Sequence, residues 1–202
     1  EGNLQAMADF AREHGMQLRP HAKMHKSATL AKLQIAAGAV GVCVQKTAEA
    51  EALAAGGVND IYISNEVIAP HKLKRVVALA RTLAERGGQL ALAVDSLHGI
   101  AQLALASLGQ PVRIRLLVEI DVGHGRCGVQ PGAAAVPLVN AIAAHPTLLF
   151  GGLQAYHGRA QHFRTAAERE AAVAQVVADV QRTMAALQDA GHHVPLVTGA
   201  GS

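Results

Sequence analysis

Aromatic residues are scarce in this sequence of 202 residues: they make up 2% of it, with three Phe, two Tyr and no Trp. Proteins that bind single-stranded nucleic acid stack bases on aromatic side chains inside a basic groove. The formal net charge is only +3 with neutral His, which is too small to indicate binding to a phosphate backbone. The sequence therefore argues against a nucleic-acid partner, and its core must be built from Ala, Leu, Val and Ile.

Cysteine and long apolar runs are also in short supply. The two cysteines, Cys43 and Cys127, lie far apart and lack the spacing of a metal site, so free thiols in a reducing cytosol are the simplest interpretation. No apolar run approaches the length of a membrane span, and no signal peptide is visible. We therefore expect a cytoplasmic protein without a membrane partner.

What the sequence does contain is an alternation of two periodicities. Short apolar runs predict six buried strands: Val40–Val44, Asp60–Ser64, Gln89–Val94, Val112–Ile120, Leu148–Ala155 and Val194–Thr198, with Gln17–His21 as a less regular strand before them. Amphipathic stretches predict the helices between them: Ser27–Ala37, Thr47–Ala55, Pro70–Arg86, Leu97–Leu108, Gly132–Ala144 and Thr165–Ala190. The last helix begins with a capping box, Thr165 and Glu168.

This alternation is typical of a parallel sheet covered by helices. About seven strand–helix units favour an α/β fold of the (β/α)8 TIM-barrel type, incomplete here, over an open doubly wound sheet. Both ends look cut, because the chain starts at Glu1 inside a helical pattern and stops at Ser202 just after a strand. We therefore expect residues 1–202 to be one barrel domain from a longer protein.

Reactive groups of such barrels lie at the carboxyl ends of the strands. Lys23 follows the first predicted strand among Arg19, His21, His25 and Lys26. Partial desolvation and neighbouring cations would lower the pKa of its amine and make it a nucleophile. Residue type alone favours an ordinary exposed lysine, since lysines are mostly solvated.

Three more segments at strand ends carry unusual polar residues. Arg126 lies in a Gly-rich turn, where its guanidinium could donate to a phenolic or carboxylate oxygen or pair with a nearby acid. Tyr156, His157 and His162 follow a later strand, and a histidine there could be a general base or a hydrogen-bonded rim residue.

The third segment is the Gly-rich end of the chain. It could form an anion-binding nest of backbone N–H groups or simply a tight turn. Its residues are Thr198, Gly199, Ala200, Gly201 and Ser202.

Five motifs in this order resemble the D-threonine aldolase family of fold-type III enzymes: "RPHAKMHK", "CVQKTAEAEALAAGGVNDIYISNEV", "EIDVGHGRCGV", "GGLQAYHGRAQH" and "VTGAGS". This family is related to D-serine dehydratases and has an alanine-racemase-like N-terminal barrel. The resemblance implies pyridoxal 5′-phosphate as cofactor and a C-terminal β-rich domain that supplies ligands to a divalent metal ion. No residue of this chain matches those ligands, so we expect no metal ligands within it.

Carried over residue by residue, the resemblance implies that Lys23 binds the cofactor covalently and that Arg126 and Tyr156 contact its ring. His162 matches the base that takes the β-hydroxyl proton, and Gln45 matches a rim position near the cofactor. The Gly-rich end from Thr198 to Ser202 matches the phosphate loop, with Ser202 where the family usually has Thr.

The implied activity is a metal-assisted retro-aldol cleavage of a D-β-hydroxy amino acid, of the D-threonine type, to glycine and an aldehyde. Two alternatives share the scaffold: a 3-hydroxy-D-aspartate aldolase, and a D-serine or 3-hydroxyaspartate dehydratase. A third is a non-catalytic carrier of pyridoxal phosphate. The expected partner is therefore a small D-amino acid, and assembly as a homodimer is left open.

Overall fold

The computed structural model describes residues 2–199, and within this range six strands form a single sheet. The strands are β1 (Val42–Val44), β2 (Asp60–Glu66), β3 (Gln89–Val94), β4 (Ile114–Glu119), β5 (Leu148–Gln154) and β6 (Val197–Thr198). The α-helices are α1 (Gly2–Glu13), α2 (Ala28–Ala36), α3 (Thr47–Ala55), α4 (Pro70–Ala84), α5 (Leu97–Ser107), α6 (Val136–Ala143) and α7 (Ala166–Asp189). Three 3₁₀ turns complete the elements: η1 (Ala22–Met24), η2 (Ala133–Ala135) and η3 (Ala160–His162).

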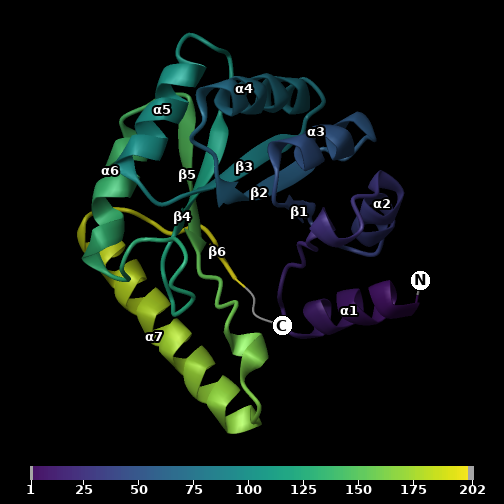
Figure 1. Cartoon of the computed structure of the whole chain (residues 1–202), viewed down its shortest axis with the longest axis vertical. Helices are drawn as coiled ribbons and strands as arrows, with labels where there is room; N and C mark the ends of the chain where they lie inside the picture. Colours follow the sequence, from purple (N-terminus) through teal and green to yellow (C-terminus); the bar gives the residue numbers. More distant parts are fainter. Residues whose placement is uncertain (1, 200–202) are drawn as a thin grey trace.

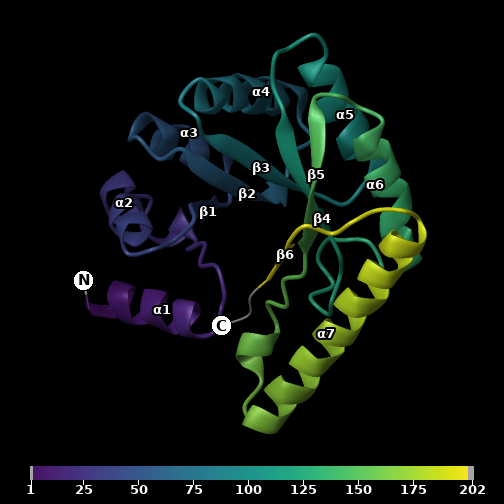
Figure 2. The ribbon, with the colours of Figure 1, turned by 180° about the vertical axis from the view of Figure 1, so that it is seen from behind.

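All strands are parallel and pair in sequence order, β1 to β6. The sheet curls into a half-barrel, and α2 to α7 follow one another around its convex side (Figures 1 and 2). Sequential parallel pairing with a helix in each crossover is the topology of a (β/α)8 barrel. The predicted incomplete barrel is thus confirmed.

Side chains alternate between the two faces of each strand. On β2, Ile61 and Ile63 join the large core beneath the helices, whereas Tyr62 joins a separate small cluster on the concave face. The other members of this inner cluster are Cys43, Ala91, Ala93 and Leu117. Glu119 lies two residues after Leu117 and therefore on the same inner face, at the carboxyl end of β4.

The strand predicted over 17–21 was wrong in detail. This segment makes only an isolated parallel bridge between His21 and Cys43, in which Cys43 N–H donates to Pro20 O, and one further backbone bond from Val40 N–H to Leu18 O. Pro20 has no N–H to donate, which limits regular pairing. The segment still runs beside β1, so it delivers Lys23 to the edge where the strands end.

The long helix α7 begins as the sequence predicts. Thr165 Oγ1 accepts a hydrogen bond from Glu168 N–H (3.2 Å), and a carboxylate oxygen of Glu168 accepts one from Thr165 N–H (2.9 Å). This reciprocal pair satisfies two N–H groups that would lack helical partners.

None of the helices between residues 2 and 199 is both long and apolar enough to span a bilayer.

Gly152 allows β6 to pair with β5. Its φ is +127°, and a Cβ at this position would overlap Leu196 O, the acceptor for Leu153 N–H at 2.9 Å. We expect Gly152→Ala to lower the free energy of unfolding by about 2 kcal/mol or more, because backbone would have to move. Urea denaturation measures this, with Gly87→Ala as the control, since Gly87 has φ +69° and open space around it. Equal losses in the two variants would contradict the overlap.

Candidate active site

The carboxyl ends of the parallel strands bring the predicted site residues to one edge of the half-barrel. Gln45 follows β1, Arg126 lies in the loop after β4, and Tyr156 follows β5. Thr198 is the last residue of β6. Strand topology alone therefore places these four residues, which are far apart in sequence, along the same rim.

Lys23 lies in the 3₁₀ turn η1, and His21 fixes the backbone there. The Lys23 N–H donates to His21 Nδ1 (3.3 Å), while His21 Nε2 lies 3.4 Å from Ser64 Oγ, which in turn donates to Val44 O at 3.3 Å. Burial, and then the charge of Lys23, lower the pKa of His21 to about 4. His21 is therefore neutral at physiological pH, so Nδ1 can accept and Nε2 can donate. The sequence motif gave no individual role to His21, which the structure identifies as a support for Lys23.

The cationic surroundings expected for Lys23 are weaker than the sequence indicates. Lys26 Nζ lies 3.4 Å from Glu49 Oε1, so its charge is paired. The other oxygen of Glu49 accepts hydrogen bonds from the N–H groups of Gln45 (3.0 Å) and Lys46 (3.2 Å). The Lys23 side chain is exposed in this chain, so the described residues do not provide the expected desolvation.

Arg126 and Tyr156 come together across two loops. The Arg126 Cζ lies 6.0 Å from the centroid of the Tyr156 ring, at the outer limit of a cation–π contact. Asp121 holds the loop that carries Arg126, because its Oδ1 accepts from Gly123 N–H (3.0 Å) and Gly125 N–H (2.9 Å). Burial would raise the pKa of Asp121, but these backbone bonds lower it below its usual value. The guanidinium pairs with neither Glu119 nor Asp121, and its Nε instead donates to Cys127 Sγ at 3.5 Å.

Glu119, one of the nearby acids that the sequence offers as a partner for Arg126, meets Glu66 in a group that the sequence did not reveal. Glu119 is 4% exposed, and its Oε1 accepts a hydrogen bond from Cys127 Sγ at 3.0 Å. Oxygens of Glu66 and Glu119 and the Cys127 sulfur all lie within 4.8 Å of one another. The sequence contains one indication of this position. Glu119 ends an apolar strand and lies two residues after Leu117, so both side chains point to the inner face of the sheet.

His162 stands apart from these contacts. It ends η3, its side chain is exposed, and among residues 2–199 no hydrogen bond to that side chain is formed. The structure therefore places His162 on the loop after β5, on the same rim as Tyr156, without bringing it against Lys23 or Arg126. A different histidine, His124, lies beside Tyr156, with 5.4 Å between the centroids of the two rings.

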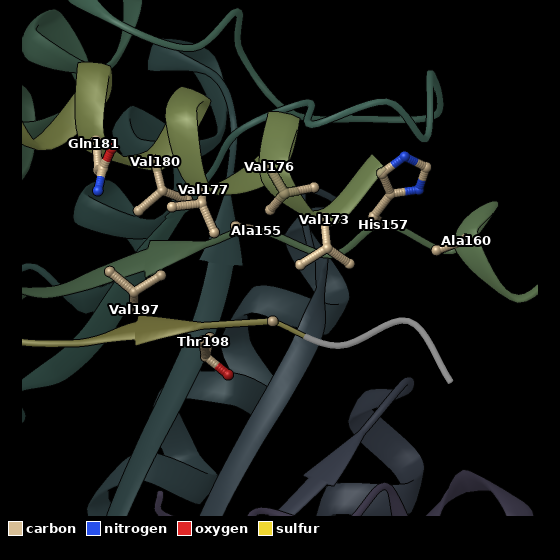
Figure 3. Close-up of a pocket in the computed structure, with 11 residues that line it drawn as sticks. Ala155, His157, Ala160, Val173, Val176, Val177, Val180, Gln181, Val197 and Thr198 are labelled. Atoms are coloured by element: carbon tan, nitrogen blue, oxygen red, sulfur yellow. The ribbon is translucent and has the colours of Figure 1, made fainter. Parts of the chain in front are cut away.

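An apolar cavity of about 350 Å³ reaches this edge, because its lining includes His157, Thr198 and Gly199. It lies between α7 and the β5–β6 pair, with Val177 and Val180 on the helix side and Val197 on the strand side. Figure 3 shows Val197 pointing toward these valines and Thr198 pointing the opposite way. This cavity is therefore a gap in the packing of α7 against β5 and β6, beside the strand ends that carry Thr198 and Gly199.

At the Gly-rich end, only Thr198 and Gly199 belong to the described residues; Ala200, Gly201 and Ser202 lie outside them. A Cβ on Gly199 would overlap Ala155 O, and the N–H of Ala155 donates to Thr198 O at 2.7 Å. Glycine is therefore required at the close approach between β5 and the end of the chain.

With this geometry in place, a comparison with family models gives one that covers the entire chain: the alanine racemase N-terminal domain matches residues 1–202. The chain belongs to this family. It is 41% identical over 203 residues to the 3-hydroxy-D-aspartate aldolase of Paracoccus denitrificans (strain Pd 1222), which covers all of this chain and 51% of that protein. It is 40% identical over 202 residues to the D-threonine aldolase of an Arthrobacter species, covering all of this chain and 52% of that protein.

A comparison with solved structures also finds a D-threonine aldolase. The D-threonine aldolase from Filomicrobium marinum superposes with a TM-score of 0.93 at 42% identity, over 98% of this chain and 52% of that one. The resemblance to D-threonine aldolases is thereby confirmed. The chain spans about half the length of the curated relatives it matches.

Proposed function

We propose that this chain is the cofactor-binding barrel of a pyridoxal-phosphate-dependent carbon–carbon lyase that cleaves D-β-hydroxy amino acids of the D-threonine type to glycine and an aldehyde. The observation that carries the proposal is the placement of Lys23, Arg126 and Tyr156 on one rim of a half-barrel. Identity of 40–41% to two aldolases over the full chain supports it.

The donor set fits pyridoxal phosphate. Lys23 is an accessible primary amine held by its backbone, which suits a covalent link to an aldehyde. Arg126 is a permanent donor for an oxygen on the ring, and the Tyr156 ring is an apolar face for it. Gly199 lets the backbone at the end of β6 approach Ala155 closely, and Gly-rich backbone of this kind can form an anion-binding nest.

We assign the following roles in the reaction. When bound, the cofactor supplies an electron sink for the negative charge left on Cα. Lys23 would hold the cofactor through its side-chain amine. His162 accepts the proton of the β-hydroxyl while the Cα–Cβ bond breaks, and Gln45 lines the rim beside the cofactor. Cα then takes up a proton to give glycine, and the former β-carbon leaves as the aldehyde.

Further features of the whole protein are part of the proposal. A divalent metal ion would polarise the β-hydroxyl, and its ligands lie outside residues 1–202. The protein is cytoplasmic, which two free cysteines support. A homodimer remains a prediction that sedimentation can check.

The test of the activity is product analysis. The full-length protein with pyridoxal phosphate and a divalent cation should convert D-threonine to glycine and acetaldehyde and leave L-threonine untouched. Turnover of D-3-hydroxyaspartate in preference to D-threonine would move the assignment to the related aldolase. An oxo acid with ammonia would identify a dehydratase, and cofactor binding without any turnover would identify a carrier.

A further inference from the structure

Two acidic side chains meet on the concave face of the half-barrel, next to the inner apolar cluster. Glu119 ends β4 and is 4% exposed, and Glu66 ends β2 and is partly buried. A register shift on β2 between Ile63 and Glu66 pairs Glu66 with Ala93 of the inner cluster. The two carboxyl groups therefore come from strands separated by β3, yet an oxygen of each lies within 4.8 Å of the other.

Neither carboxyl group is fully satisfied. Glu66 Oε1 and Glu119 Oε2 are both buried, and neither has a hydrogen-bond partner among residues 2–199. Buried polar atoms without partners are costly, and two adjacent negative charges in a poorly solvated place repel each other. A single proton held between the two groups removes one charge and satisfies an acceptor on each side.

A chain of donors leads from this pair to Arg126. Cys127 Sγ donates to Glu119 Oε1 at 3.0 Å, and Arg126 Nε donates to Cys127 Sγ at 3.5 Å. The thiol is therefore the link between the carboxyl pair and the guanidinium. Cys127 contacts both Glu119 and Arg126, so the orientation of Arg126 is linked to the pair through this thiol.

We propose that Glu66 and Glu119 share one proton near neutral pH, and that this pair, acting through the Cys127 thiol, is a positioning group for the Arg126 guanidinium. The contact of Arg126 with the cofactor ring rests on the proposed function, whereas the shared proton does not.

The protonation behaviour of the neighbours agrees with this arrangement. Burial raises the pKa of Glu119 to about 7. The thiol hydrogen bond opposes this rise, and the nearby charge of Glu66 adds to it. Burial raises the pKa of Cys127 to about 12, so the thiol keeps the proton that it donates. Burial also raises the pKa of Tyr62 well above its usual value, so the phenol on β2 stays neutral.

The remaining charges around Glu119 do not supply an alternative partner. Arg126 favours the ionised form of Glu119 but directs its Nε to sulfur. Asp95, the residue directly after β3, accepts from Gly128 N–H at 3.1 Å. Glu66, Glu119 and Cys127 are also potential ligands for a divalent cation. The permanent positive charge of Arg126 beside the thiol disfavours a second cation there.

The first experiment needs no cofactor. Carboxyl carbons of glutamate are labelled in the apo-protein and titrated by NMR; one resonance should titrate near pH 7 and disappear in Glu119→Gln. Glu170→Gln, an exposed acid on α7, is the matched control and should leave that resonance unchanged. Titration of every glutamate at ordinary values, or persistence of the resonance in Glu119→Gln, would overturn the shared proton.

A second arm separates a proton from a metal ion. Zn²⁺ and Mn²⁺ are added to the apo-protein and followed by calorimetry. Stoichiometric binding that is lost in both Cys127→Ala and Glu119→Gln would overturn the proposal in favour of a metal centre. If neither ion binds, or if binding is the same in these two variants as in the unchanged protein, the shared proton is supported.

The positioning role is read from the cofactor-loaded full-length protein. Cys127→Ala should weaken binding of pyridoxal phosphate by about 10-fold, the equivalent of one hydrogen bond, and shift the pH dependence of its visible band. Cys127→Ser keeps a donor and should restore both. Identical behaviour of the Ala and Ser variants would overturn the link. If the protein bound no pyridoxal phosphate at all, the proposed function would fail while the titration in the apo-protein would still decide the shared proton.

Discussion

We expect Lys23→Ala to abolish the covalent attachment of pyridoxal phosphate and, with it, turnover. Lys23 is the lysine that η1 presents at the rim, with its backbone N–H bonded to neutral His21. Without the amine no covalent link forms, so the visible band of the lysine-bound cofactor disappears. Absorbance spectra of the reconstituted full-length protein measure this directly.

Lys46→Ala is the control, since Lys46 is an exposed lysine on the same rim, at the start of α3. It should keep the visible band and the activity. A Lys23→Ala protein that retained the band would show that another lysine carries the cofactor.

His162→Ala should leave cofactor binding intact and reduce cleavage by about 10²–10⁴-fold, the usual contribution of a general base. The exposed side chain makes no hydrogen bond within residues 2–199, so its removal should not disturb the barrel. The measurements are the visible spectrum, which stays unchanged, and the rate of glycine formation from D-threonine, which falls.

His98→Ala on α5 is the matched control, because His98 is also exposed but lies on the convex, helical side. Turnover of His162→Ala equal to that of the control would remove the base role from His162. A loss of the visible band in His162→Ala would instead indicate that His162 supports the cofactor.

Much of the barrel could be predicted because each element has a clear local signal. The bounds of β3 and α3 agree with the predicted Gln89–Val94 and Thr47–Ala55. β-Branched and leucine-rich runs buried on both faces indicate parallel strands whatever the partner strand is. The rim followed from topology alone, since parallel strands end on one side.

The contacts within the site could not be predicted, because they depend on how distant segments meet. The Lys26–Glu49 ion pair joins the loop before α2 to the first turn of α3, and it pairs a charge that the motif assigns to the surroundings of Lys23. The pairing of Glu66 with Ala93 depends on a register shift in β2, which no sequence periodicity shows. The segment over 17–21 looked like a strand because it is extended, but Pro20 interrupts its pairing.

The central claim is that Lys23 binds pyridoxal phosphate covalently, and borohydride reduction tests it most directly. The reconstituted full-length protein is reduced, digested, and its peptides are analysed by mass spectrometry. The account predicts a phosphopyridoxyl group on Lys23 and on no other lysine. A reduced adduct on a different lysine, or none at all in a protein that binds the cofactor, would contradict it.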